Sequence, residues 1–300
     1  MGRIDLIQLL RIEGCSWDES ACAEAAEHGQ IETLQWLRAQ GCPWDSRTCS
    51  SAAEFGSFKE LKWARANGCP WNEETCEKAA YGGYLHILQW ARAEGCPWDE
   101  TTCIAAVIRD TPAIVQWAYE NGCPCGERTF AAAASRGYIE TLEYLASVGC
   151  PIDSTTAYAE AALEGRIGVI AWMRRRGILW DSWTCAGAAR AGRIDLLQFL
   201  RLYGCPWDQE TCTAAAIRGD LAILKWAREN GCEWDEGAAF VTAISQALSQ
   251  GFNPAIAKQS WKMQTGCPWD ELHFPAASQK DRRDVFDWLR NNGCPGTNYD

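Results

Sequence analysis

A stripe of large apolar residues with helical spacing recurs along this chain. A clear copy is Ile31-Leu34-Trp36, where polar residues such as Gln35 separate the apolar positions. The same pattern returns at Leu85-Leu88-Trp90 and at Leu221-Leu224-Trp226. Spacing of this kind predicts an amphipathic helix with one face in a core.

A shorter helix with small side chains is predicted before each stripe. In residues 46–55, Cys49, Ala52 and Ala53 fall on one helical face. Small residues on that face allow neighbouring helices to approach closely. Each unit is therefore predicted to be a helix, a tight turn and a second helix.

Polar residues and glycines mark where these helices begin and end. Asp45 stands at an N-cap position before residues 46–55, and Gly56 stands at the C-terminal glycine position. Phe130 and Ala157 are predicted to replace the first-helix cysteine in two units. The other capping positions hold Asp18, Asn72, Asp99, Asp153, Asp181, Asp208, Asp235 and Asp270.

The units are separated by Gly-Cys-Pro-Trp-Asp or a near copy of it. The copies begin at Gly14, Gly41, Gly68, Gly95, Gly122, Gly149, Gly177, Gly204, Gly231, Gly266 and Gly293. Eight of the ten intervals are 27 residues long, one is 28 and one is 35. A fixed period of this length predicts a stack of identical units that share one core.

We therefore expect a single repeat domain over residues 1–300, with about ten helical pairs and half-units at the ends. The 8 extra residues of the long interval fall within 236–254. They are interpreted either as part of a binding face or as a tolerated loop expansion.

One segment shows a family resemblance. Ala52-Ala53-x-x-Gly56-x-Phe58-x-x-Leu61-x-Trp63, closed by Gly68-Cys69, resembles the second half of an ankyrin repeat. An ankyrin unit has about 33 residues, so about six are missing where that family builds its β-hairpin finger. The resemblance implies an all-α, ankyrin-like α-solenoid with these fingers shortened or absent. Such short units are similar to those of ankyrin-like proteins of giant viruses, algae and oomycetes, which are interpreted as interaction modules.

Charge and composition restrict the expected partners and compartment. The net charge of −11 predicts no affinity for nucleic acid or for an anionic membrane. No apolar stretch approaches the roughly 20 residues of a membrane span, and residues 1–5 lack a signal-peptide pattern. We expect a protein of the cytoplasm, or of cytoplasm and nucleus, that is not secreted; a viral protein would lie in the host cytoplasm.

The cysteines are numerous and follow the repeat. Of the 17, ten follow the boundary glycine and six lie seven residues further on. Cysteines fixed in a repeat are expected to be small packing residues, so we predict no metal site and no cofactor. Pairs such as Cys42 and Cys49 leave a metal or redox role as an alternative, although zinc sites favour closer spacing.

Arginine and tryptophan also recur at fixed positions. Arginines such as Arg38 and Arg65 lie three residues before the boundary glycine. There they are expected to complement the helix dipole and to pair with the capping aspartates, or to form a phosphate-binding stripe. The tryptophans are expected to form a ladder in the core rather than a platform for bases or sugars.

No catalytic motif is present, so we expect a protein that is not an enzyme. The resemblance implies that the first helices line a concave face, where positions five and six residues after the first-helix cysteine lie side by side. Exposed aromatics and arginines there are typical of interaction hot spots, although ordinary surface variation is an equal alternative. The candidate partner-binding residues are Glu27, His28, Glu54, Phe55, Tyr81, Ile108, Arg109, Arg136, Arg190 and Arg218.

The sequence thus predicts a monomeric scaffold or adaptor that binds another protein through this face. One alternative is a structural component of a viral particle or another large assembly. A second alternative is a cysteine-rich metal or redox-responsive module.

Overall fold

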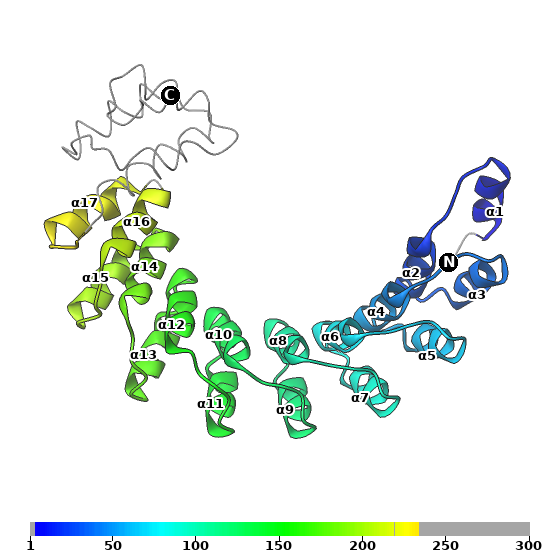
Figure 1. Ribbon diagram of the computed structural model, residues 1–300, viewed down its shortest axis with the longest axis horizontal. Coiled ribbons are helices and arrows are strands. Elements are labelled where there is room, and N and C mark those ends of the chain that lie inside the picture. The colour runs from blue at the N-terminus through cyan, green and yellow to red at the C-terminus, as the bar shows by residue number, and fades with distance from the viewer. Residues whose placement is uncertain (1–3, 219, 234–300) are drawn as a thin grey trace, which may run out of the picture. The chain divides into compact units, whose positions relative to one another are not determined.

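The computed structural model describes residues 4–218 and 220–233, and all the regular elements in these residues are α-helices (Figure 1). Two kinds of helix alternate along the chain. The first helices of the repeats are α2 (Glu19–Glu27), α4 (Ser46–Glu54), α6 (Glu73–Gly82), α8 (Glu100–Ile108), α10 (Glu127–Arg136), α12 (Ser154–Leu163), α14 (Ser182–Ala191) and α16 (Gln209–Arg218). The second helices are α1 (Ile4–Ile12), α3 (Ile31–Ala39), α5 (Phe58–Ala66), α7 (Leu85–Ala93), α9 (Pro112–Glu120), α11 (Ile139–Ser147), α13 (Ile167–Arg175), α15 (Ile194–Leu202) and α17 (Leu221–Glu229).

The chain divides into two compact units, each described by itself. Unit 1 comprises residues 1–133 and 138–152, and unit 2 comprises residues 134–137 and 153–300. The predicted insertion in 236–254, Asp235, Asp270 and the last two boundary sequences lie outside the described residues.

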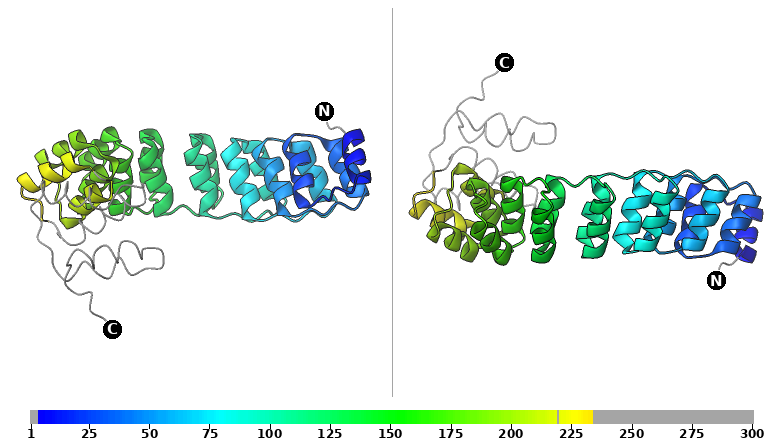
Figure 2. Two further views of the ribbon diagram at one scale, coloured as in Figure 1. Left: turned by 90° about the horizontal axis from the view of Figure 1, so that it is seen from above. Right: turned by 90° about the horizontal axis from the view of Figure 1, so that it is seen from below.

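Within each unit, the first helices pack directly on one another. In unit 1, α2 packs on α4, α4 on α6 and α6 on α8, and in unit 2, α12 packs on α14 and α14 on α16. Views from above and below show the helices of each unit side by side in rows (Figure 2). Buried small residues such as Ala52, Ala53 and Cys49 permit this close approach.

The second helices touch their own first helices extensively and one another only sparsely. They are therefore more widely spaced than the first helices within a unit (Figure 1). The first helices lie on the inner side of the curve of each unit as a result. The all-α solenoid predicted from the period is confirmed, and no β-strand stands between the helical pairs of the described residues.

Aspartate caps begin most of the first helices. The Asp45 carboxylate accepts from the Arg47 amide at 3.0 Å, and the Asp99 carboxylate accepts from the Thr101 amide at 2.9 Å. Asn72 is an exception, because its side chain makes no capping hydrogen bond. The other side-chain caps are Asp18, Asp153, Asp181 and Asp208.

The turn between the two helices of a repeat requires a left-handed residue. Gly56, with φ of +76°, is typical of this position. Asp110, with φ of +59°, takes the place of glycine before Pro112, which begins α9. Aspartate is one of the few side chains that tolerate this conformation.

The 28-residue interval has a local structural cause. The backbone of Asp153 has ψ of 102°, whereas Asp45 has ψ of −167°. The extra residue lies just after this altered cap, between Asp153 and Tyr158, so Tyr158 lies seven residues before its turn glycine, as Cys49 does. The prediction that Ala157 replaces the first-helix cysteine is therefore wrong, and Tyr158 occupies that position.

Candidate interaction surface

Pairs of thiols join the two ends of six of the described repeats. The Cys49 and Cys69 thiols are in hydrogen-bond contact, although 20 residues separate them. The Cys69 thiol also lies 3.3 Å from the Asp45 carbonyl oxygen of the preceding loop. Equivalent thiol pairs are Cys22 and Cys42, Cys76 and Cys96, Cys103 and Cys123, Cys185 and Cys205, and Cys212 and Cys232.

This pairing differs from the spacing that the sequence suggested. Cys42 contacts Cys22 rather than Cys49, because the first helix carries Cys49 onward to the next boundary. Burial raises the pKa of Cys22 to about 12. The hydrogen bond with Cys69, followed by burial, raises the pKa of Cys49 above its usual range. A buried thiol with a raised pKa is a poor nucleophile, so we interpret Cys22 and Cys49 as packing groups.

The recurrent arginine lies in the last helical turn, as predicted, and makes contacts that the sequence did not predict. Arg38 stacks on Trp44, with its guanidinium carbon 4.1 Å from the ring centroid, and donates to the Cys42 carbonyl oxygen. Trp44 in turn packs edge-on against Trp63, with centroids 5.9 Å apart. The same arginine–tryptophan stack occurs at Arg11 and Trp17, Arg65 and Trp71, Arg92 and Trp98, Arg174 and Trp180, and Arg201 and Trp207.

The expected pairing of these arginines with capping aspartates is therefore wrong for the described repeats. The Cys42 carbonyl lies in the turn after α3, and a planar guanidinium can donate to it while it stacks on an aromatic ring. The half-buried tryptophans form a ladder, as predicted, but arginine is part of it.

The predicted residues of unit 1 lie in a row. Glu27 and His28 end α2, Glu54 and Phe55 end α4, Tyr81 lies on α6, and Ile108 and Arg109 end α8. These four helices pack consecutively, so the structure brings the seven residues together along one edge. We call this set the unit 1 row.

Two aromatic side chains stand out in the unit 1 row. Phe55 is 52% exposed and Tyr81 is 41% exposed. Lys78 connects their helices through an ion pair of 2.9 Å with Glu54 and lies 5.7 Å from the Tyr81 ring. The hydrogen bond with Glu54 raises the pKa of Lys78 above its usual range, so Lys78 stays charged near neutral pH.

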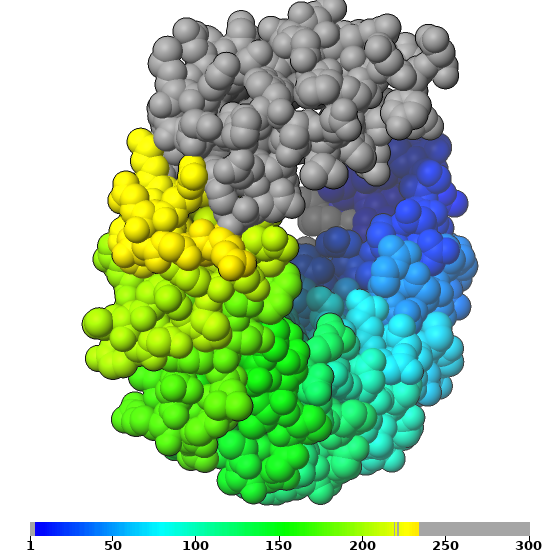
Figure 3. Space-filling model, turned by 60° about the vertical axis from the view of Figure 1, so that its left-hand side comes forward, coloured from blue at the N-terminus to red at the C-terminus, as the bar shows by residue number. Residues whose placement is uncertain are grey.

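The other three predicted residues belong to unit 2. Arg136, Arg190 and Arg218 are exposed at the C-terminal ends of α10, α14 and α16. An Arg218 guanidinium nitrogen donates to the Arg190 carbonyl oxygen at 3.2 Å. In Figure 3, the atoms of the described residues of unit 2 (green to yellow) form a continuous surface.

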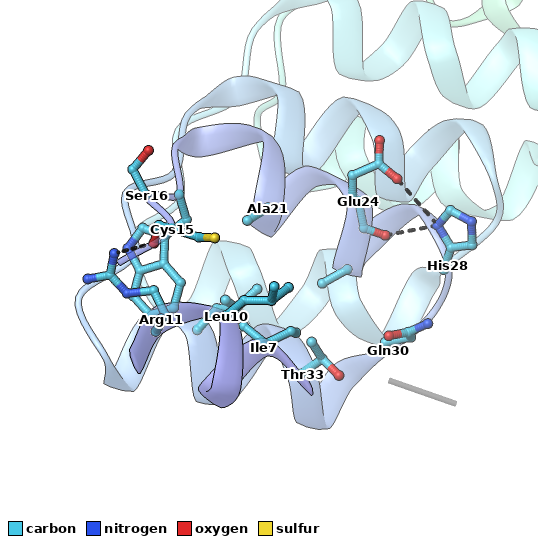
Figure 4. Close-up of a pocket in the computed structure, with 13 residues that line it drawn as sticks. Ile7, Leu10, Arg11, Cys15, Ser16, Ala21, Glu24, His28, Gln30 and Thr33 are labelled. Carbon is cyan, nitrogen blue, oxygen red and sulfur yellow. Dashed lines mark hydrogen bonds and ion pairs between the residues drawn. The ribbon is translucent and has the colours of Figure 1, made fainter. Parts of the chain in front are cut away.

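A cavity of about 440 Å³ opens between α1, α2 and α3 (Figure 4). Ile7 and Leu10 of α1 line it together with Ala21 of α2. The corresponding space beside α4 is filled by α2, whereas no first helix of the described residues packs on the α1 side of α2.

A cluster at the edge of this cavity is the only one in the described residues that could hold a metal ion. Its members are Glu24, Glu27 and His28, which are exposed or half-buried. The His28 Nδ1 atom lies 3.0 Å from the Glu24 carbonyl oxygen and 3.9 Å from its carboxylate. Exposed acidic groups of this kind are common without a metal, and we assign no metal site here.

None of the helices in the described parts of the chain is both long and apolar enough to cross a bilayer.

Comparisons with known proteins give matches only among solved structures. No protein-family model matches the chain, and no curated protein sequence is similar to it. The chain is similar to the pentatricopeptide repeat protein PPR10 from maize at 14% identity and a TM-score of 0.39, over 92% of this chain and 49% of that chain. Two complexes of PPR10 with an 18-nt psaJ RNA element, one of them a triple cysteine-to-serine variant, match at 15% identity and a TM-score of 0.33, over 97% of this chain and 56% of theirs. The chain thus spans about half the length of the solved structures that it matches.

These matches correct the prediction that nucleic acid is excluded as a partner. The exclusion of nucleic acid is wrong, because two of the similar helical-repeat structures hold RNA. It rested on the net charge of the whole chain, which hides local differences. Between Arg166 and Arg218 the chain has eight arginines and only four carboxylates.

Proposed function

We propose that this protein is a non-enzymatic, ankyrin-like scaffold of the cytoplasm, or of cytoplasm and nucleus, that binds a protein partner through the unit 1 row. The observation that carries the proposal is the exposure of Phe55 and Tyr81 on adjacent helices. Large aromatic residues on a rigid surface are the usual energetic centres of protein interfaces.

The repeat framework supports this role by leaving the row free to vary. The cysteines, the small residues and the arginine–tryptophan stacks are used to hold neighbouring repeats together. The row residues are not part of these contacts, and their types differ from repeat to repeat. A surface of this kind is preorganised, so little conformational entropy is lost when a partner binds.

The charges of the row favour a partner surface that carries both acidic and basic side chains. Glu27 and Glu54 alternate in the row with His28 and Arg109, beside the Glu54–Lys78 ion pair. We expect aromatic anchoring by Phe55 and Tyr81, with the charges setting orientation and association rate.

A pull-down from cell lysate, read by mass spectrometry, tests the proposal. The full chain is compared with a Phe55→Ala, Tyr81→Ala, Arg109→Ala variant. The matched control carries Gln35→Ala, Lys62→Ala and Gln89→Ala, which are exposed on second helices of the same unit. Circular dichroism confirms that all three proteins are folded.

The proposal predicts a partner that the wild type and the control recover and the row variant loses, with or without ribonuclease. Equal recovery by the row variant would contradict it. If ribonuclease abolished recovery of the partner and RNA cross-linked directly to the chain, the partner would be RNA and not a protein.

A further inference from the structure

A second cavity, of about 300 Å³, lies on the second-helix side of unit 2. Ile170, Arg174 and Arg175 of α13 line one side of it. Phe199 of α15 and the following Tyr203 line the other side, with Trp180 of the intervening loop. We call it the α13–α15 cavity.

The aromatic ladder is altered where this cavity lies. Phe199 occupies the position that Trp117 and Trp226 hold in other repeats. Trp117 packs edge-on against the loop residue Trp98 at 5.8 Å. Phe199 instead packs on Tyr203 at 4.6 Å. A phenyl ring is smaller than an indole, so part of the space beside Trp180 stays open.

The arginine of this repeat, Arg174, also differs from its counterparts in its contact with the turn carbonyl. In five other repeats the matching arginine donates to the turn carbonyl, as Arg201 does to Cys205. Here the Tyr158 hydroxyl donates to the Ile178 carbonyl oxygen at 2.9 Å, and no hydrogen bond of the described residues joins Arg174 to it. Arg174 still stacks on Trp180 at 4.1 Å, so its N–H groups remain available at the cavity.

Exposed apolar side chains adjoin the cavity lining. Leu179 is 74% exposed, Leu202 is 80% exposed and Tyr203 is 61% exposed. Most other repeats have polar or small residues or proline at these three positions, for example Pro97, Glu120 and Asn121, although Ile12 and Val148 are apolar at the second and third. Apolar residues gathered where the repeat pattern is polar or small indicate a contact surface.

The charges at this site favour an acidic ligand. Arg174 and Arg175 both line the cavity. The nearest carboxylate along the loop, Asp181, already caps α14 by accepting from the Trp183 amide at 3.1 Å. Guanidinium groups next to an apolar cavity suit a carboxylate beside a hydrophobic side chain.

We propose that the α13–α15 cavity binds an acidic protein segment, with an aromatic or leucine side chain inserted beside Phe199 and flanking carboxylates on Arg174 and Arg175. The aliphatic rim of Leu179 and Leu202 favours a protein segment over RNA, because nucleobases are held mainly by stacking and hydrogen bonds. This site is independent of the unit 1 row and of the function proposed for it.

The test uses an array of short peptides in which the central residue is varied and the flanks are all glutamate or all lysine. The full-length protein is expected to bind peptides with central Trp, Phe or Leu and glutamate flanks, and fluorescence anisotropy then measures the best one. Phe199→Trp with Tyr203→Asn restores the residues of other repeats, so it fills the cavity without a foreign side chain. This variant is expected to weaken binding by about tenfold or more.

Two controls make the result decisive. Gln198→Ala, an exposed neighbour on α15, and the unit 1 row variant must both bind the peptide as the wild type does. No preference for glutamate flanks, or unchanged binding by the Phe199→Trp, Tyr203→Asn variant, would overturn the proposal. If the wild type bound a single-stranded RNA probe instead of the peptide, and this variant lost that binding, the proposal would be overturned in favour of nucleic acid.

Discussion

The hydroxyl group of Tyr158 on α12 donates a hydrogen bond of 2.9 Å to the carbonyl oxygen of Ile178. The two residues are 20 positions apart, as are Cys49 and Cys69 in their thiol pair. The buried side chain of Tyr158 therefore replaces a pair of thiols. It also donates to the turn carbonyl oxygen that accepts from an arginine in other repeats. Burial raises the pKa of Tyr158 above its usual range, so the hydroxyl remains a neutral donor at physiological pH.

Removal of the hydroxyl in Tyr158→Phe is expected to lower the free energy of unfolding by about 1 kcal/mol, the typical value of one hydrogen bond. Tyr158→Ala also removes a buried ring and is expected to cost about 3–5 kcal/mol. Urea denaturation followed by circular dichroism measures both changes. Tyr203→Phe, at an exposed position, serves as the control. A Tyr158→Phe variant as stable as this control would show that the hydrogen bond contributes nothing.

The arginine–tryptophan stack is expected to depend on the shape of the guanidinium group as well as on its charge. Arg65 lies 3.9 Å from the Trp71 ring centroid and donates to the Cys69 carbonyl oxygen. Arg65→Lys keeps the charge, but an ammonium group cannot stack and donate in the same geometry. Arg65→Lys and Arg65→Ala are both expected to cost about 1–2 kcal/mol.

The measurement is again the urea midpoint, with Arg109→Ala as an exposed control on unit 1. If Arg65→Lys matched the wild type while Arg65→Ala did not, simple charge would account for the position and the stacking explanation would fail.

Local rules were sufficient to predict the helices of the described repeats. Asp45 and Gly56 delimit α4 because capping depends only on residues within one turn. The period of 27 residues then predicts the stack, since each unit must bury its apolar face on the next.

The partners of side chains across a repeat boundary were harder to predict. To predict the thiol pairs, one must know which end of the first helix lies next to the boundary turn. The spacing of cysteines along the chain does not give this information.

The arginine–tryptophan stack, in contrast, has a signal in the sequence. Where Tyr119 and Ala146 replace the arginine, Cys125 and Ile152 replace the loop tryptophan. The altered register at Tyr158 was missed because the extra residue lies in the first turn of α12, between the capping Asp153 and Tyr158.

Thiol reactivity is expected to follow burial. Cys15 is exposed and Cys125 is half-buried, whereas the other 13 cysteines of the described residues are buried. Brief alkylation of the native protein, read by mass spectrometry, should therefore label Cys15 first and Cys125 more slowly. Cys22 should stay unlabelled when the pH is raised from about 7 to about 9, because burial raises its pKa to about 12.

Protein unfolded in urea provides the control in which all of these cysteines react. Labelling of Cys42 in the native protein as rapid as that of Cys15 would show that the thiol pairs open readily, and the redox-responsive alternative would then regain support.

Gly187 gives a prediction in which packing opposes helix propensity. It lies within α14, where alanine is normally better than glycine by about 1 kcal/mol. The matching positions in other repeats hold Ala105 and Ala214, so the repeat pattern alone would permit alanine. In the structure, however, a Cβ atom on Gly187 would stand 2.6 Å from the Ala159 carbonyl oxygen of α12. Because a helix backbone moves only together with its whole helix, this contact forces α12 and α14 apart.

Gly187→Ala is therefore expected to lower the free energy of unfolding by about 1–3 kcal/mol, the usual cost of overpacking. Gly168→Ala, at an exposed position in α13, should instead be neutral or stabilising by up to about 1 kcal/mol. Urea midpoints of the two variants and the wild type decide the sign of each change. A stabilising Gly187→Ala would mean that α12 and α14 can separate without loss. The close packing of first helices would then be a consequence of their small residues and not a requirement of the fold.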